Sequence, residues 1–222
     1  MRKCSRRKSP LDKQKKKVVK KNERSFRRED ATVENGAKRV AIMKATLELV
    51  ADHGFHGAPM AMVAERAGVG SGTIYRYFES KDVLIIETFA DLEQRLVAAV
   101  MADYPEGGPV RERFLHMASI LVGYCVSSPM EFRFLEQFHN SPYGSAHRRE
   151  KLFGKQDKDI CTELFAEARE KRVVKDLPLA VLFSLAFAPL LGICRDQILG
   201  FIKMDDGLLG QSVEACWDAV RR

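Results

Sequence analysis

Apolar residues recur along this 222-residue chain at the spacing of helices, and no stretch alternates between apolar and polar residues as a half-buried strand does. Residues 36–53 are predicted to be helical because Ile42, Ala45 and Leu49 share one face. Glycine and proline residues mark the breaks between later segments. The further helices predicted in this way cover residues 59–67, 71–78, 81–101, 110–127, 130–139, 145–171, 178–202 and 206–220. The pattern therefore predicts an all-α chain of about nine helices.

Residues with known positional preferences support several of these boundaries. Pro59 suits the first position of a helix, because the missing N–H has no partner there in any case. Ser80 is expected to cap the following long helix, with Asp82 in its first turn favoured by the helix dipole. The proline and glycine residues within 104–109 end that helix and form the best candidate for a joint.

Residues 63–84 are the most informative part of the pattern, with two short helices about a glycine-bearing turn. Ile74 and Phe78 form the apolar face of the second helix. Its other face gathers hydrogen-bond donors and aromatic hydroxyls, namely Ser71, Thr73, Tyr75, Arg76 and Tyr77. A helix built for packing has little need of such a set. A helix in a DNA groove needs small residues for close approach, hydroxyls for phosphates and an arginine for a base edge or a phosphate.

These residues resemble the DNA-binding region of the tetracycline-repressor (TetR) family. The segments that match the family pattern in register are 54–55, 63–69, 72–78 and 81–84. The resemblance covers about residues 38–90. It implies a three-helix helix-turn-helix head followed by a larger helical body for effector binding and dimerisation. The domains expected on this basis are a basic arm at 1–34, the head at 35–82 and the body at 83–222.

The family's DNA contacts carry over to the start and exposed side of the second helix. The corresponding residues are Gly70, Ser71, Gly72, Thr73, Tyr75, Arg76, Tyr77 and Lys81. Ser71 and Arg76 are expected at base or groove edges, and the others at the backbone. Residues 58–61 depart from the pattern, because Ala-Pro-Met-Ala stands where hydroxyl side chains are usual. We therefore expect the helix at 59–67 to bind phosphates through its backbone amides alone, and more weakly than is usual in the family.

The body is expected, by resemblance, to bind a small apolar or amphipathic effector. Aromatic and methionine side chains recur there at helical spacing, which suits either an adaptable cavity or an ordinary bundle core. The candidates for lining an effector pocket are Phe114, Met117, Tyr124, Phe132, Phe134, Phe138 and Phe153.

Residues 177–194 form an uncharged run of 18 residues, at the lower limit of a membrane span. Two prolines interrupt the run and Arg195 follows it at once, so we interpret it as a buried helix with no membrane partner. By resemblance, the last two helices form a four-helix interface in a homodimer. The residues assigned to core and dimer contact are Leu182, Leu185, Leu190, Ile193, Val213, Trp217 and Val220.

The net charge of +7 belongs to the N-terminal arm. Residues 1–28 contain fourteen Lys and Arg against Asp12 and Glu23, a net of +12, so residues 29–222 sum to −5. The arm is interpreted as a segment that follows the DNA backbone or enters the minor groove. The alternative is an extension of no consequence, or one that is not translated because Val33 is the start. No apolar face accompanies the charges, which disfavours adhesion to lipid, and the arm has no apolar segment of signal-peptide type, so we do not expect it to direct secretion.

Catalytic and metal chemistry is weakly represented in the sequence. Glu136-x-x-His139 lacks the second copy that a di-iron site requires, and His53-x-x-His56 lacks a third ligand. The five cysteines are widely spaced, as reduced thiols in a cytoplasmic protein are. We therefore expect no enzyme, no cofactor and no metal.

The function predicted is that of a cytoplasmic, ligand-responsive transcriptional regulator. It would be a homodimeric repressor that binds a palindromic operator and is released by its effector. Two alternatives remain open. One is an architectural protein that binds DNA through the arm without reading sequence, and the other is a helical carrier or enzyme that retains the head.

Overall fold

The computed structural model describes residues 35–153 and 159–222, so the predicted basic arm at 1–34 lies outside the described residues. The described residues are all-α, as predicted, with ten helices and no strand. A first helix spans residues 35–53. The others are α2 (Met60–Arg66), α3 (Ser71–Ile74), α4 (Lys81–Met101), α5 (Val110–Ser127), α6 (Pro129–His139), α7 (Pro142–Phe153), α8 (Ile160–Glu170), α9 (Leu179–Ile198) and α10 (Asp206–Val220).

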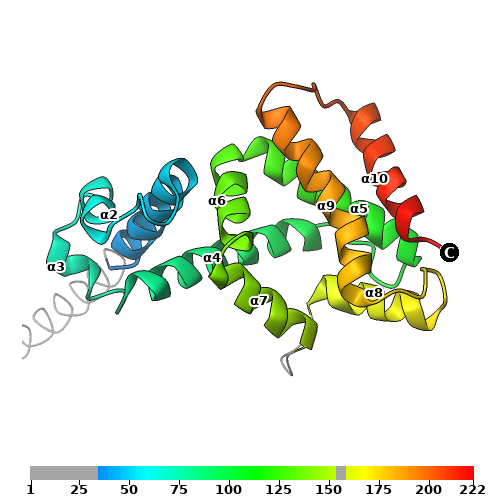
Figure 1. Ribbon diagram of the computed structural model, residues 1–222, viewed down its shortest axis with the longest axis horizontal. Coiled ribbons are helices and arrows are strands. Elements are labelled where there is room, and N and C mark those ends of the chain that lie inside the picture. The colour runs from blue at the N-terminus through cyan, green and yellow to red at the C-terminus, as the bar shows by residue number, and fades with distance from the viewer. Residues whose placement is uncertain (1–34, 154–158) are drawn as a thin grey trace, which may run out of the picture.

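The helices form a small head and a larger body (Figure 1). The first helix, α2 and α3 make up the head at one end of the molecule. Helix α4 leaves the head and runs into the body, which contains α5 to α10. Helix α6 stands between the two parts, and α8 and the end of α10 lie at the far end from α3.

The ends of α2, α3 and α4 test the predicted boundaries directly. The Ser80 hydroxyl accepts a hydrogen bond from the Val83 amide at 3.2 Å, which confirms the predicted cap of α4. Pro59 precedes α2 with an extended ψ of 151°, so its placement at the first helical position was wrong by one residue. Helix α3 ends at Ile74, short of the predicted residue 78, because 75–77 form turns.

The helix predicted over residues 145–171 is two helices in the structure, α7 and α8, and the residues 154–158 between them are not described. The start of α8 is set by Asp159, whose carboxylate accepts from the Thr162 amide at 2.8 Å and from the Thr162 hydroxyl at 2.9 Å. An aspartate before an apolar helical pattern indicates the start of a helix, and the prediction of one long helix did not take Asp159 into account. The helix predicted to end at 202 ends at Ile198, because Gly200 adopts a positive φ of 79°.

Two apolar clusters hold the molecule together, and the division between them does not follow the division into head and body. One cluster fills the body. The other contains the head's core and reaches into α6, where it includes Phe134 and Phe138. Phe138 stacks on Phe89 of α4 with ring centroids 3.7 Å apart and ring planes 5° apart. The head is therefore packed on α6 through buried aromatic rings.

A polar network on α4 reinforces this joint. Arg95 donates to Asp91 at 3.1 Å, to the Tyr124 hydroxyl at 3.0 Å and to Glu131. Burial, followed by the hydrogen bond to Glu131, raises the pKa of Tyr124 to about 12. One guanidinium thus links α4 to both α5 and α6.

We predict that Phe138→Ala destabilises the protein by about 3–5 kcal/mol, because it empties the cluster that joins the head to α6. Chemical unfolding followed by circular dichroism measures the loss. Tyr75→Ala is the matched control, since Tyr75 is 57% exposed and its loss should change stability by less than about 0.5 kcal/mol. Equal effects of the two substitutions would contradict the shared core.

Candidate nucleic-acid interface

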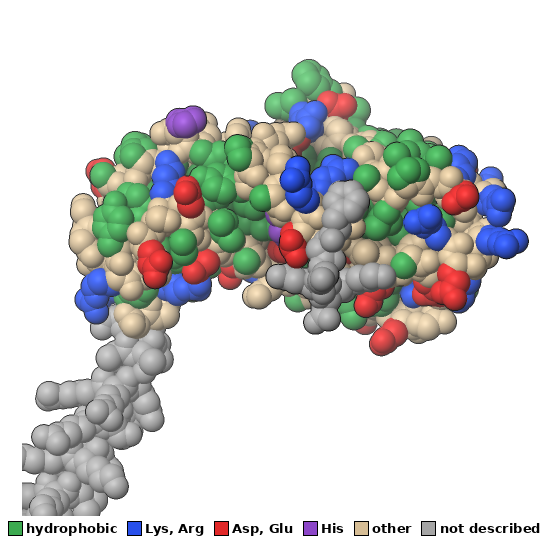
Figure 2. Space-filling view, turned by 60° about the horizontal axis from the view of Figure 1, so that its bottom comes forward, with side chains coloured by type: hydrophobic (Ala, Val, Ile, Leu, Met, Phe, Trp, Pro, Cys, Tyr) green, Lys and Arg blue, Asp and Glu red, His purple; other side chains and the backbone are tan. Residues whose placement is uncertain are grey.

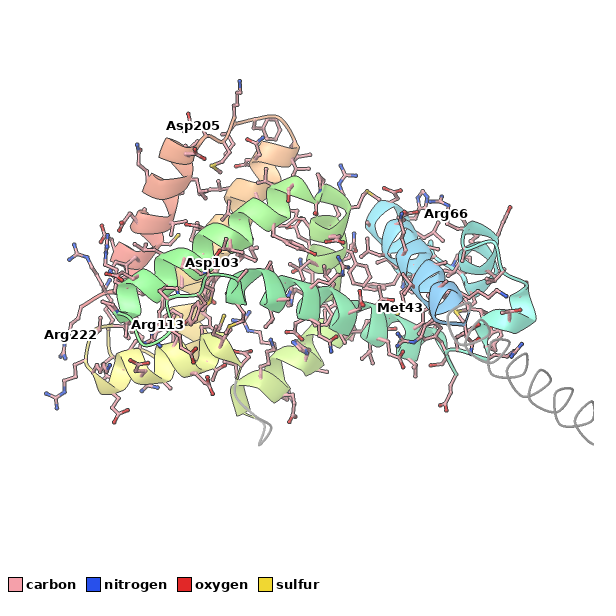
Figure 3. The ribbon with its side chains drawn as sticks, turned by 180° about the vertical axis from the view of Figure 1, so that it is seen from behind. Met43, Arg66, Asp103, Arg113, Asp205 and Arg222 are labelled. Atoms are coloured by element: carbon pink, nitrogen blue, oxygen red, sulfur yellow. The ribbon has the colours of Figure 1, made fainter. Side chains whose placement is uncertain are left out.

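A tight turn presents α3 to solvent. Gly68 ends α2 with a φ of 66°, and the Val69 amide donates to the Ala64 carbonyl at 2.9 Å. Arg66, two residues before Gly68, pairs with Glu48 of the first helix at 3.3 Å and so connects α2 to that helix (Figure 3). Ile74 and Phe78 are buried in the head's core, as predicted. The opposite side of α3 is left facing outward.

The predicted DNA contacts are largely on this outward side. Exposed members of the set are Gly70, Ser71, Gly72, Tyr75 and Arg76. Thr73, Tyr77 and Lys81 are partly buried. The structure therefore brings the set together at one end of the head, and the contacts themselves stay a prediction.

Neither glycine at the start of α3 is required by packing. A Cβ atom added at Gly72 would meet nothing within 4 Å, and one added at Gly70 would lie 3.5 Å from the Thr73 hydroxyl. Neither residue has a positive φ, so neither glycine is required by the backbone conformation. A smooth surface here suits the close approach of a DNA backbone to the helix.

Two of the predicted contacts are engaged within the head. The Tyr77 hydroxyl donates to the Asn35 side chain of the first helix. The Lys81 ammonium donates to the Phe55 carbonyl, and partial burial lowers the pKa of Lys81. Tyr77 and Lys81 thus help to join the elements of the head. Sequence reasoning missed Asn35 and Phe55 as their partners, because both lie far away along the chain.

The start of α2 has no side-chain cap. Pro59 occupies the capping position and makes no side-chain hydrogen bond. Ala61 and Met62 follow with exposed side chains that offer no polar atom. The free donors at this helix start are the backbone amides of Met60, Ala61 and Met62, whose partial positive charge suits a phosphate, and the weaker hold on DNA stays a prediction.

The predicted effector residues divide between the two clusters. Phe114, Met117 and Phe132 lie in the body cluster. Phe134 and Phe138 lie in the cluster of the head, with Tyr124 packed against it. The side chain of Phe153 lies outside the described part of the structure. The six described members of the set therefore do not surround one space, because residues two positions apart on α6 face opposite sides of the helix.

The body cluster contains aromatic residues that the sequence interpretation did not select as effector candidates. Phe114 lies within 5.8 Å of Phe187 and 5.3 Å of Trp217, measured between ring centroids. Phe165 lies 5.2 Å from Phe183. Phe183 and Phe187 are only partly buried on α9. Both residues lie in the uncharged run 177–194. Because that run is apolar on all sides, its sequence does not indicate which of its residues face Phe114 and Phe165.

A cavity of about 400 Å³ lies at the joint between head and body. The first helix supplies Val40, Met43 and Leu47, and α6 supplies Met130. Its size falls within the range of small-molecule sites, and its lining combines these apolar side chains with polar and charged ones, among them Lys44, Glu48, Asp91 and Arg95. It contains Glu131 but no aromatic member of the predicted effector set.

The predicted dimer residues lie mostly inside the protomer. The fully or nearly buried ones are Leu182, Leu190, Val213, Trp217 and Val220, which all belong to the body cluster. Leu185 is exposed and Ile193 is partly buried. Helix α9 is the one described helix long and apolar enough to cross a membrane by length and composition. One face of it packs on α5 and α10.

The other motifs have structural partners. Glu136 forms an ion pair with Arg195 of α9, and His139 packs edge-on against Phe89 at 5.6 Å between ring centroids. Among residues 35–153 and 159–222, no group of three or more His, Cys, Asp and Glu side chains is placed to hold a metal ion.

Two family models match the chain. The model of the bacterial regulatory proteins of the tetR family matches residues 42–88, and the model of the tetracyclin repressor-like C-terminal domain matches residues 109–221. The chain belongs to the TetR family. It is a transcriptional regulator with a helix-turn-helix DNA-binding head, and α2 and α3 are the two helices of that motif.

Individual proteins are also similar to this chain. The structure of a putative TetR-family regulator from Vibrio parahaemolyticus is 31% identical, with a TM-score of 0.66, over 83% of this chain and 99% of that one. The fatty acid metabolism regulator protein of Bacillus subtilis is 30% identical over 34% of this chain, and the match spans only 39% of that relative. The structure of a FadR regulator from Bacillus subtilis in complex with stearoyl-CoA has the same fold, with 17% identity and a TM-score of 0.63 over 82% of this chain and 97% of that one.

We predict that Gly72→Ala leaves the fold intact and weakens binding to operator DNA at least about tenfold. The new methyl group has room in the free protein, and alanine favours a helix by up to about 1 kcal/mol, but it would stand where DNA approaches. Melting curves and fluorescence anisotropy on DNA selected from a random pool measure the two effects. Gly123→Ala, at an equally open position on α5, should change neither the fold nor DNA binding. Unchanged affinity in Gly72→Ala would remove α3 from the interface.

Proposed function

We propose that this protein is a homodimeric repressor that reads a near-palindromic operator and is released by a small amphipathic effector. The observation that carries this proposal is the geometry of α3, which has an exposed polar face and a buried face seated on the core shared with α6. Such a regulator acts in the cytoplasm, where the DNA is. We keep the division into head (35–82) and body (83–222), although α4 continues across that boundary.

In the proposed complex, α3 of each protomer enters one major groove. Ser71 and Arg76 contact base or groove edges, because both are exposed at the outer side of the helix-turn-helix motif. The amides at the start of α2 receive a phosphate. Lys and Arg are interspersed with Asp and Glu on the face drawn in Figure 2, so binding rests on these placed groups rather than on a broad basic surface.

The exposed side of α9 is the proposed dimer surface. Val181 is 41% and Leu185 36% exposed, and Ala188 and Pro189 continue the same side of the helix at exposed positions. Leu208 at the start of α10 is 37% exposed. The buried leucines on the opposite side of α9 support this surface rather than contact the partner. A second copy of α9 and α10 would cover it as a four-helix contact.

The proposed effector carries an apolar chain. Two relatives point to this chemistry, since one is named a fatty acid metabolism regulator and another was solved with stearoyl-CoA. In this protein, the apolar part would bind among the aromatic residues of the body cluster. Helix α6 connects that cluster to the head, because Phe132 belongs to one cluster and Phe134 to the other. Binding would shift the population toward a head position that no longer fits the operator.

DNase I footprinting on genomic fragments tests the proposal against an architectural role. We expect protection of a discrete near-palindromic site by the full chain, and the same site after deletion of residues 1–34. Arg76→Ala should lose the preference for that site. Uniform protection independent of sequence, lost on deletion of the arm, would establish the architectural alternative instead.

We predict that Leu185→Lys converts the dimer to a monomer, because it places a charge at the centre of the apolar face of α9. Analytical ultracentrifugation measures the mass in solution. Val97→Lys is the control, since Val97 is 40% exposed on α4 and lies outside the proposed dimer surface. A dimer that survives Leu185→Lys and dissociates in Val97→Lys would move the interface to α4.

A further inference from the structure

A hollow of about 630 Å³ is lined by residues of α8 and of the end of the chain. These segments lie at the end of the body opposite α3 (Figure 1). The hollow is separate from the outward face of α3 and from every predicted effector residue. Its walls come from the end of α8, the segment that joins α8 to α9, and the residues after α10. The lining residues are Ala166, Arg169, Glu170, Arg172, Val174, Lys175, Asp176 and Arg222. We call this hollow the distal groove.

The distal groove concentrates positive charge in a part of the chain that is acidic overall. Four of its side chains are cationic and two are anionic, whereas residues 29–222 together carry a net charge of −5. Figure 2 shows Lys and Arg side chains at the end of the body opposite the head, with Asp and Glu side chains beside them. Arg169 faces Asp176 at 3.8 Å, a loose pair in which the Asp176 side chain is 92% exposed. The charge is therefore only partly compensated within the groove.

Two of the cations have unused hydrogen-bonding capacity. The side chains of Arg172 and Arg222 make no hydrogen bond or ion pair within the described residues. Figure 3 shows Arg222 at the extreme end of the body. Each guanidinium offers five N–H donors in a planar fork that matches the oxygens of a phosphate.

Backbone hydrogen bonds fix the wall that carries these cations. The Lys175 amide donates to the Val220 carbonyl at 2.9 Å, and the Arg222 amide donates to the Val173 carbonyl at 3.0 Å. The Lys175 ammonium donates to the Ala219 carbonyl at 2.6 Å. The segment after α8 and the end of the chain are thus joined by an antiparallel bridge in which Lys175 stands opposite Val220 and Arg222 opposite Val173, so the backbone of this wall is fixed before any ligand binds.

Arg172 occupies a backbone position that favours glycine. Its φ is 56°, and it follows the last turn of α8, where the Val173 amide returns to the Ala168 carbonyl at 2.9 Å. The same position is Gly68 after α2 and Gly200 after α9. A side chain at a positive φ is destabilising, so arginine at this position is not explained by the fold.

We propose that the distal groove binds a small ligand that carries two or more phosphate groups. Arg172 and Arg222 bind the phosphates through paired N–H donors. Arg169 and Lys175 contribute further positive charge to the lining. The volume is that of an ordinary small-molecule site and suits a ligand of about nucleotide size. Helix α3, the proposed DNA-reading helix, lies at the other end of the molecule. The proposal is independent of the operator and of the apolar effector.

Isothermal titration of the full-length protein with tripolyphosphate, at constant ionic strength, tests the proposal. Arg172→Gly should weaken binding at least about tenfold and yet raise the melting temperature by about 2–4 °C, because glycine relieves the strained backbone. Asp103→Gly is the matched control, since Asp103 also has a positive φ, 57°, and lies outside the groove. It should raise the melting temperature and leave the affinity unchanged.

Hydrogen–deuterium exchange locates the bound ligand. The basic arm contributes the same background in every variant, so protection by tripolyphosphate is read at residues 170–176 and 219–222. Equal affinity in wild type, Arg172→Gly and Asp103→Gly would overturn the proposal, as would protection confined to other parts of the chain. Tight binding of a poly-glutamate peptide in place of tripolyphosphate would also overturn it, by assigning the groove to an acidic peptide.

Discussion

The packing of the head on α6 is the constraint on which the rest of the molecule depends. Phe134 and Phe138 of α6 are buried with the head, whereas Phe132 is buried with the body. Residues two positions apart on a helix lie roughly 200° apart around its axis, so α6 has one apolar face for each cluster. Buried aromatic clusters repack between discrete arrangements rather than deform smoothly. A rotation of α6 would therefore change the packing of both clusters at once. The same interaction that stabilises the fold also couples its two parts.

The surfaces proposed to bind partners are those that the fold needs least. The outward side of α3 and the exposed side of α9 contribute little to the cores. They can therefore be used for partners at small cost in stability. Tyr77 and Lys81 are the exception, because each has a partner within the head. Donation by the Tyr77 hydroxyl to DNA would compete with its hydrogen bond to Asn35, whereas the Lys81 ammonium keeps further N–H donors for a phosphate.

Sequence alone was sufficient for the features that depend on neighbours along the chain. The all-α class, the cap at Ser80 and the uncapped start of α2 all follow from residues within one turn of each other. Features that depend on contacts between distant segments were not accessible. Periodicity grouped Phe132 with Phe134 and Phe138, although they lie in different clusters. The split between α7 and α8 was missed because a capping aspartate inside a polar stretch gives a weak signal.

The uncapped start of α2 has a consequence for the ionic-strength dependence of DNA binding. Neutral amides hold a phosphate without cancelling a full charge, so they displace few of the cations condensed on DNA. A head that relies on such amides, on hydroxyls and on Arg76 would bind with a shallow dependence on salt. The steep part of that dependence would come from the fourteen basic residues of the arm. The head would then recognise the DNA sequence, and the arm would supply the general attraction to the DNA polyanion. The ionic strength of the cell would mainly change the contribution of the arm to DNA affinity.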